Sequence, residues 1–218
     1  MVQNKSYSTT NGQHDCEFTL TLSIKGVNKM PHALLICGSL AQNAHTLALL
    51  QYTEQRLQQA GWTTLIWNLR QTPLPMVDPA YHHDPHLYPD AVVQRFIECV
   101  QQADAIIVGS PNYHNSYSGV LKNALDWTNM DIFKQKVVGL MANGGGLRST
   151  QPLDHLRIVI RGLLGLAIPA QVAACNSDFV IENESYLLQN PDIILRVNTF
   201  VEQLITYSSK FIRNESTK

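Results

Sequence analysis

Ala-Leu-Leu-Ile-Cys-Gly-Ser, residues 33–39, is an unbroken apolar run that ends in two small residues. A strand without polar alternation is buried on both faces, which is typical of a parallel sheet covered by helices. The stretch Asp104–Gly109 repeats this pattern and again ends in glycine, and Lys136–Ala142 repeats it ahead of Asn143. These three runs predict the central strands of one parallel sheet.

Shorter strands and several helices alternate with these runs along the chain. The strands are predicted at Thr63–Trp67 and Ala170–Ala174, and the helices at Thr46–Ala60, Asp90–Gln102, Val120–Met130, Pro152–Leu164 and 191–211. Residues 70–90 hold five prolines and are predicted as an irregular loop. The alternation favours an α/β fold with a doubly wound five-stranded parallel sheet in the order 2-1-3-4-5. Such a sheet binds its ligand beyond the carboxyl ends of the strands, where the strand order reverses.

Composition argues against several classes of protein. The 218 residues carry 16 lysines and arginines against 17 acidic residues, without a basic run, so no nucleic acid is expected as a partner. No stretch approaches the ~18 consecutive apolar residues that span a bilayer, so no membrane is expected either. The four cysteines show no paired spacing, and Cys37, Cys99 and Cys175 are interpreted as small core residues. This cysteine usage predicts a cytoplasmic location.

Residues 1–30 differ from the predicted domain, which covers residues 31–218. Residues 1–17 are rich in Ser, Thr, Asn and Gln and lack the apolar stretch of a signal peptide. Apolar and polar residues alternate over 18–24, which is compatible with one amphipathic strand. Two interpretations stay open: a loosely ordered N-terminal extension, or a natural start at Met30 preceded by a reading-frame artefact.

The loop after the first predicted strand has the composition of a phosphate site. Ser39, Asn43 and Thr46 offer hydroxyl and amide groups just before a helix, and His45 can add to them. The free N–H groups and the dipole of the first helical turn both favour an anion. The alternative is plain helix capping by Asn43 or Thr46. The loop matches neither GxGxxG nor GxxxxGK[ST], which argues against a dinucleotide domain and an NTPase but allows a mononucleotide.

The loops after the third and fourth predicted strands are suited to a flat ring. The first of these loops contains Pro111, Asn112, Tyr113, His114, Asn115 and Ser116. Its proline stiffens the chain, its aromatic side chains can flank a ring, and its main-chain N–H groups can meet a polar edge. The second loop is Asn143, Gly144, Gly145 and Gly146, and glycines let the backbone approach a ligand closely. The alternatives are an ordinary turn and a flexible connector.

The stretch 110–127 reads Ser-Pro-Asn-Tyr-His-Asn-Ser-Tyr-Ser-Gly-Val-Leu-Lys-Asn-Ala-Leu-Asp-Trp. It resembles the P-x-Y…S-G-x-L-K-N-x-x-D-W signature of the NADPH-dependent FMN reductase family. The Gly-Ser at 38–39 and the triple glycine at 144–146 stand where that family has its phosphate loop and its flavin-edge loop. Residues 74–79 resemble the family's loop after its second strand. The resemblance runs from about Ala33 through the last predicted helix.

This resemblance implies a flavodoxin-like domain that binds FMN and passes electrons from NADPH, with NADH possible, to a small-molecule acceptor. The acceptors compatible with it are a quinone, free flavin, an azo dye or a metal oxyanion. It also implies that Ser39 and Thr46 hold the FMN phosphate, that 111–116 line the isoalloxazine ring, and that 144–146 meet its other edge. The family is commonly dimeric or tetrameric, so a homodimer or homotetramer is expected. The cycle is expected to be ping-pong without a catalytic acid or base from the protein, because the flavin performs the chemistry.

One position departs from the family pattern. Many members carry a phosphate-binding arginine shortly after the Gly-Ser, where this chain has Ala41, and no Lys or Arg occurs between Met30 and Arg56. The preference for NADPH over NADH therefore stays open, and His45 is the candidate substitute.

Several residues are assigned no role in the chemistry. The three histidines and the aspartate of 81–86 are suitable zinc ligands, but their spacing matches no known pattern and no metal site is predicted. Four residues of the signature are interpreted as contacts in helix packing or in a dimer: Lys122, Asn123, Asp126 and Trp127. His155 and Arg157 can face a nicotinamide phosphate or simply lie on a solvated helix face.

The sequence bears on two other functions. A non-catalytic FMN-binding electron carrier or redox sensor is the alternative, although the near-neutral charge does not predict an acidic docking face. A hydrolase is disfavoured because no GxSxG motif occurs.

Overall fold

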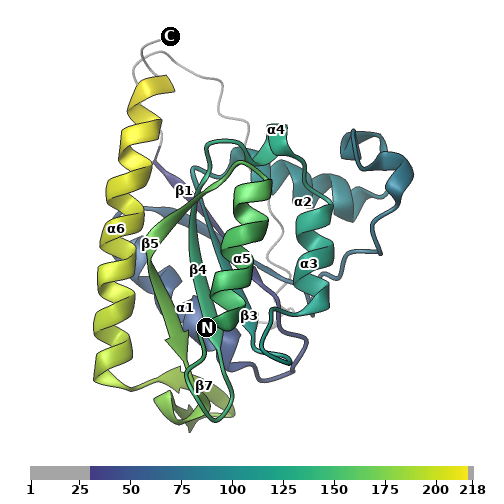
Figure 1. Ribbon diagram of the computed structural model, residues 1–218. Helices are drawn as coiled ribbons and strands as arrows, with labels where there is room; N and C mark the ends of the chain where they lie inside the picture. Colours follow the sequence, from purple (N-terminus) through teal and green to yellow (C-terminus); the bar gives the residue numbers. More distant parts are fainter. Residues whose placement is uncertain (1–29, 216–218) are drawn as a thin grey trace, which may run out of the picture.

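The computed structural model describes residues 30–215, and the predictions for residues 1–29 lie outside this range. Its main sheet has five parallel strands: β1 (His32–Cys37), β2 (Thr63–Asn68), β3 (Ala105–Pro111), β4 (Val137–Asn143) and β5 (Leu166–Ala174). They are arranged in the order β2-β1-β3-β4-β5 (Figure 1). The predicted doubly wound α/β fold is confirmed.

Helices cover both faces of this sheet. On one face lie α1 (His45–Gln59) and α6 (Pro191–Glu215), and on the other lie α2 (Ala91–Gln102), α3 (Gly119–Asp126), α4 (Met130–Phe133) and α5 (Gln151–Gly162). Alternate residues of each strand point to opposite faces, so Leu34 and Ile36 belong to one core and Leu35 to the other. Trp62 and Trp67, as well as the three cysteines assigned to the core, are buried. Within residues 30–215 no helix is both long and apolar enough to cross a bilayer.

A close approach of backbone and aromatic ring holds the α6 helix against β4, next to the edge strand β5. A Cβ atom on Gly139 of β4 would lie 2.1 Å from the ring of Phe200, which is fully buried. Only glycine therefore leaves room for this ring. The β4–β5 register shifts between Val138 and Leu140, next to this glycine.

The structure refines several of the predicted elements. The helix predicted over 120–130 ends at Asp126, because Asn129 caps the first turn of α4 through its side chain. The proline-rich loop contains two short 3-10 helices, η1 (Pro79–Tyr81) and η2 (Pro85–Leu87). The β5 strand begins at Leu166, four residues earlier than predicted.

One pair of strands was not predicted. After the 3-10 turn η3 (Asn176–Asp178), β6 (Phe179–Glu182) and β7 (Ser185–Leu188) form an antiparallel hairpin. Its two turn residues, Asn183 and Glu184, have positive φ values of 48° and 63°. This geometry is that of a two-residue hairpin turn. The hairpin lies at the carboxyl end of the main sheet, beside the start of α1.

Candidate functional site

Three loops meet beyond the carboxyl ends of the central strands. Main-chain hydrogen bonds continue from the sheet into these loops: Gly38 N donates to Gly109 O at 2.8 Å, and Asn112 N donates to Asn143 O at 2.8 Å. The Ser118 hydroxyl, at the start of α3, donates to Gly38 O at 2.6 Å. The loops after β1, β3 and β4 are thus held together on one rim, as the topology predicts.

In the first loop, Ser39 and Thr46 are buried and Asn43 is exposed. Neither Asn43 nor Thr46 caps α1. The N-cap residue is Ala44, and no side chain bonds to the first turn, so the alternative of plain capping is wrong. The first N–H groups of this 15-residue helix are therefore left for another acceptor, and such groups favour an anion.

His45, the first residue of α1, is packed under the β6–β7 hairpin. Its ring stacks on Tyr186 with centroids 3.7 Å apart and meets Phe179 edge-on at 5.1 Å. Burial lowers the pKa of His45 below its ordinary value. The imidazole is therefore neutral at neutral pH and adds no positive charge to the first loop.

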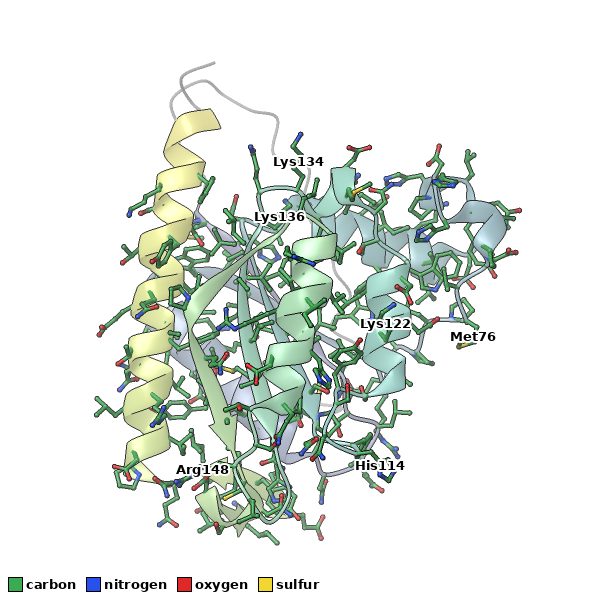
Figure 2. All side chains as sticks on the ribbon, in the orientation of Figure 1. Met76, His114, Lys122, Lys134, Lys136 and Arg148 are labelled. Atoms are coloured by element: carbon green, nitrogen blue, oxygen red, sulfur yellow. The ribbon has the colours of Figure 1, made fainter. Side chains whose placement is uncertain are left out.

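The second loop is a tight turn on a stiff base. Pro111 ends β3 and is buried, and Asn112 is half-buried. Tyr113 N donates to Ser116 O at 2.9 Å and the reverse bond measures 3.0 Å, so the intervening residues form a two-residue turn. Those residues, His114 and Asn115, are exposed and have φ values of 51° and 63°. Tyr113 is exposed as well, and His114 lies at the lower rim in Figure 2.

The third loop borders a hollow of about 590 Å³ on this rim. It is lined by Asn112, Asn115, Gly144, Gly146, Leu147, Arg148, Ser149, Thr150 and Gln151. Two side-chain oxygens here, Asn112 Oδ1 and Asn143 Oδ1, are buried without a hydrogen-bond partner among the described residues. A buried acceptor without a donor is unusual in a native protein, and a ligand with N–H groups would satisfy it.

Arg148 and Asp178 form an ion pair that the sequence did not reveal. Asp178 is buried and accepts hydrogen bonds from Arg148 Nε at 3.1 Å, from Arg148 Nη2, and from Cys175 N at 2.8 Å. Burial raises the pKa of Asp178, but the hydrogen bonds from Arg148 and Cys175 outweigh it and leave this pKa below its ordinary value. The pair connects the third loop to η3, the turn that follows β5.

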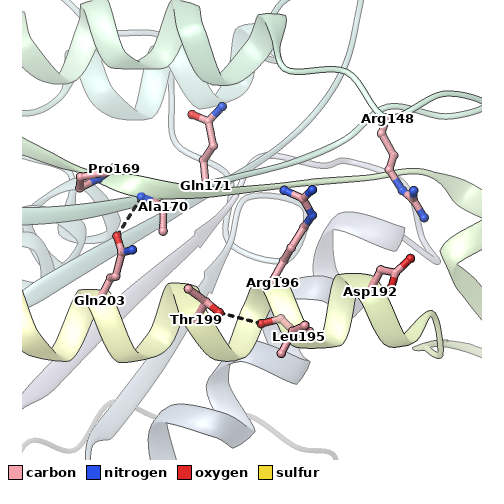
Figure 3. A pocket seen from close by; sticks show the side chains of 9 residues that line it. All are labelled: Arg148, Pro169, Ala170, Gln171, Asp192, Leu195, Arg196, Thr199 and Gln203. Atoms are coloured by element: carbon pink, nitrogen blue, oxygen red, sulfur yellow. Dashed lines mark hydrogen bonds between the residues drawn. The ribbon is translucent and has the colours of Figure 1, made fainter.

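A second hollow, larger than the one on the rim, lies elsewhere. It measures about 680 Å³ between β5 and α6 (Figure 3). Two of its polar side chains are already bonded, since Gln203 accepts from Ala170 N at 3.0 Å and Thr199 donates to Leu195 O at 3.2 Å. Only Arg148 lines both hollows. Among the described residues, Asn198 Oδ1 and Ser208 Oγ of α6 are also buried without a partner. The rim remains the candidate site because the converging loops, the uncapped start of α1 and two unsatisfied amide oxygens are found there together.

Two basic residues of α5 have partners within the fold. Ser116 Oγ lies 3.0 Å from His155 Nδ1, which joins the second loop to α5. Arg157 donates to Gln171 Oε1 at 2.8 Å and to Ile168 O at 3.0 Å on β5. His155 is exposed, as expected for a solvated helix face, whereas Arg157 is half-buried against β5. Among residues 30–215, no group of three or more His, Cys, Asp and Glu side chains could hold a metal ion.

The signature residues of α3 hold the proline-rich loop in place. Asn123 accepts from Val77 N at 2.9 Å and donates to Pro75 O at 2.7 Å, and Trp127 Nε1 also donates to Pro75 O at 2.8 Å. Their interpretation as packing residues is confirmed. Figure 2 shows Met76, between the two anchored residues, pointing outward from the body of the protein.

We expect Asn123→Ala to destabilise the fold by about 2 kcal/mol, because two hydrogen bonds to the loop are lost: Val77 N loses its acceptor, and Pro75 O keeps only the bond from Trp127 Nε1. Urea unfolding measures this change, and limited proteolysis should show faster cleavage within 70–90. Lys122→Gln is the control, since it breaks only a partly exposed ion pair with Asp126, worth roughly 0.5 kcal/mol. Equal stability of the two variants would contradict the anchoring role.

Comparison with known proteins agrees with this site. Residues 31–178 match the model of the NADPH-dependent FMN reductase family. The chain is 42% identical over 178 residues to an FMN-dependent NADPH-azoreductase of Staphylococcus aureus, covering 80% of this chain and 93% of that protein.

Solved structures show the same fold. The NAD(P)H:(acceptor) oxidoreductase FerB of Paracoccus denitrificans has a TM-score of 0.67 at 16% identity, covering 83% of this chain and 98% of that one. A Streptococcus pneumonia flavodoxin has a TM-score of 0.53 at 14% identity, covering 80% and 98%. The flavodoxin-like prediction is confirmed.

The residues on the rim fit FMN. An uncapped helix start with buried hydroxyl groups suits its phosphate, and unsatisfied amide oxygens suit the polar edge of its ring. The predicted cofactors, FMN and NADPH, and the predicted transfer of electrons through flavin to a small acceptor are confirmed by the family match. This chain belongs to the NADPH-dependent FMN reductase family.

Proposed function

We propose that this chain uses NADPH to reduce azo compounds. The observation that carries the proposal is its 42% identity over 93% of a protein named as an FMN-dependent NADPH-azoreductase. The open hollow on the rim supports it, because an extended aromatic acceptor needs an accessible site. Full cleavage of one N=N bond to two amines takes four electrons, so two NADPH molecules and two protons are consumed for each azo bond.

The residues of the rim have distinct proposed roles. The FMN phosphate lies at the start of α1, whose first N–H groups are the main donors. The residues around it are Ser39, Asn43, His45 and Thr46. The loop from Pro111 to Ser116 lines one side of the ring, and 144–146 lie against another edge. When bound, FMN supplies the hydride and electron chemistry. The protein binds and orients the reactants, and no protein side chain needs to act as an acid or base.

The two amide oxygens without partners are the strongest support for this assignment. Asn112 directly follows β3 and Asn143 ends β4, and the two residues are adjacent because Asn112 N bonds to Asn143 O. The Asn143 amide nitrogen already donates to Asn176 Oδ1 at 2.8 Å, which fixes the direction of its oxygen. Both oxygens therefore lack a donor, which the N–H groups of a ligand would supply.

The first measurement is the visible absorbance spectrum of the purified protein with FMN under anaerobic conditions. NADPH should bleach the flavin bands, and an azo dye added afterwards should restore them while two NADPH are consumed per dye. A parallel titration with NADH ranks the two donors. Bands that persist with both nicotinamides would favour the carrier or sensor, and a protein that takes up no FMN would contradict the central assignment.

The assembly and location are also proposals. We infer a homodimer or homotetramer, supported by the exposed apolar side chains of Met76, Leu87 and Met130. Light scattering of the purified protein tests it. A cytoplasmic location is supported by the three free buried thiols among the described residues. Residues 31–218 are proposed to form the FMN-binding domain, with 1–30 outside it.

A further inference from the structure

The first loop needs a positive charge that its own sequence does not provide. No lysine or arginine lies between Met30 and Arg56, and Ala41 stands in the loop itself. His45 is no substitute, because its half-buried imidazole stacks on Tyr186 and its lowered pKa leaves it neutral at neutral pH. A phosphate dianion held by helix N–H groups alone would lack a counter-charge.

The sheet order brings an arginine to this loop from a distant part of the sequence. β2 pairs with β1 so that Asn68 lies opposite Cys37, and the chain turns immediately after both strands. Asn68 shapes the turn after β2, because its side chain accepts from Arg70 N at 3.0 Å. Arg70 then extends across to the first loop, where its Nη1 donates to Leu40 O at 2.6 Å.

The Arg70 guanidinium is exposed, and most of its N–H groups are available to a ligand. Of its five N–H groups only one is engaged by the described residues, at Leu40 O. Neither of the two ion pairs among residues 30–215 includes it, so its charge is not neutralised within the described part of the chain. A planar guanidinium with free N–H groups is the side chain best suited to a phosphate.

We propose that Arg70 supplies the positive charge for the FMN phosphate at the first loop, in place of the arginine that this loop lacks. This inference rests on the proposed FMN site. Leu40 lies one residue after Ser39 and four before Ala44, the N-cap of α1, so the guanidinium stands beside the proposed phosphate position. The bond to Leu40 O holds the arginine there before the cofactor arrives, which reduces the entropy lost on binding.

The test compares FMN with riboflavin, which has the same ring but no phosphate. Each flavin is titrated into the apoprotein, and binding is followed by quenching of flavin fluorescence. Arg70→Gln should weaken FMN binding by about tenfold, the value of one charge-assisted contact at an exposed site. Riboflavin binding should stay unchanged, and added salt should weaken FMN binding less in the variant than in the unchanged chain.

Two further variants make the result specific. Arg56→Gln removes the same charge from the opposite end of α1, where the Arg56 side chain donates to Gln59 Oε1, and it should leave both affinities unchanged. Arg70→Lys keeps the charge and should retain much of the preference for FMN over riboflavin.

Three results would overturn the inference. One is unchanged FMN affinity in Arg70→Gln. Another is an equal loss for both flavins, which would assign Arg70 to the shape of the loop. If the unchanged chain binds riboflavin and FMN equally, no phosphate site exists for Arg70 to serve. A chain that binds neither flavin would instead overturn the proposed function itself.

Discussion

Gly144→Ala should reduce FMN affinity by on the order of a hundredfold and destabilise the fold by about 3 kcal/mol. A Cβ atom at this position would lie 2.0 Å from Leu147 O and 3.1 Å from Ser149 N. Both are main-chain atoms, so no side chain can move aside, and the turn from 144 to 149 must change shape. This turn borders the hollow on the rim and its shape is needed for the proposed flavin edge.

Fluorescence titration with FMN and urea unfolding measure the two effects. Gly162→Ala is the matched control, because a Cβ atom there meets nothing within 4 Å and the residue lies at the end of α5, away from the rim. It should leave FMN affinity unchanged and leave stability equal or higher by up to about 1 kcal/mol. An FMN affinity in Gly144→Ala within a factor of about three of the unchanged chain would refute the proposed contact.

Asp178→Ala should lower the free energy of unfolding by about 3 kcal/mol. The substitution leaves Cys175 N without its buried acceptor and releases Arg148 from the wall of the hollow. For a chain of this length the melting temperature should fall by roughly 6–12 °C. Asp154→Ala, which removes an exposed carboxylate from the first turn of α5, should cost no more than about 1 kcal/mol.

The pH dependence of the Asp178 variant follows from the direction of its pKa. Burial raises this pKa, but the hydrogen bonds from Arg148 and Cys175 lower it by a larger amount. The pKa in the folded state therefore lies below the pKa in the unfolded state. The stabilisation by the carboxylate is therefore fully present above the unfolded value of about 3.9 and is lost as the pH falls through the folded value. The stability difference between the unchanged chain and the variant should be constant from pH 6 to 8, to about 0.5 kcal/mol, and shrink below about pH 4. A stability difference that grows as the pH falls would contradict the stabilisation of the fold by the ionised Asp178 carboxylate.

The central fold was predictable because its signals are local. Each central strand is a continuous apolar run, and each run ends in small or polar residues that the parallel topology must place on one rim. The start of β5 was not predictable in this way. Pro169 interrupts the run, and a proline argues against a strand unless it lies at an edge or a bulge. β5 is an edge strand with a register shift at this point, so both conditions hold.

The charged parts of the site depend on neighbours that are distant in sequence. Arg70 reaches Leu40 only because β2 pairs with β1, and Arg148 reaches Asp178 only because the ends of β4 and β5 are adjacent. No spacing along the chain predicts such contacts. The β6–β7 hairpin left a weak local signal, since asparagine at its turn favours positive φ, but four-residue strands are too short to recognise by alternation.

The contact between Gly139 and Phe200 also bears on how this sequence can diverge. The Phe200 ring of α6 fills the space that a side chain at position 139 of β4 would occupy. A larger residue at one position therefore requires a smaller residue at the other. Alanine at 139 is compatible with the fold only if position 200 carries a smaller side chain, and a large ring at 200 requires glycine at 139. In relatives that keep α6 in this place, the two positions should therefore change together, as a correlated pair separated by sixty-one residues of sequence.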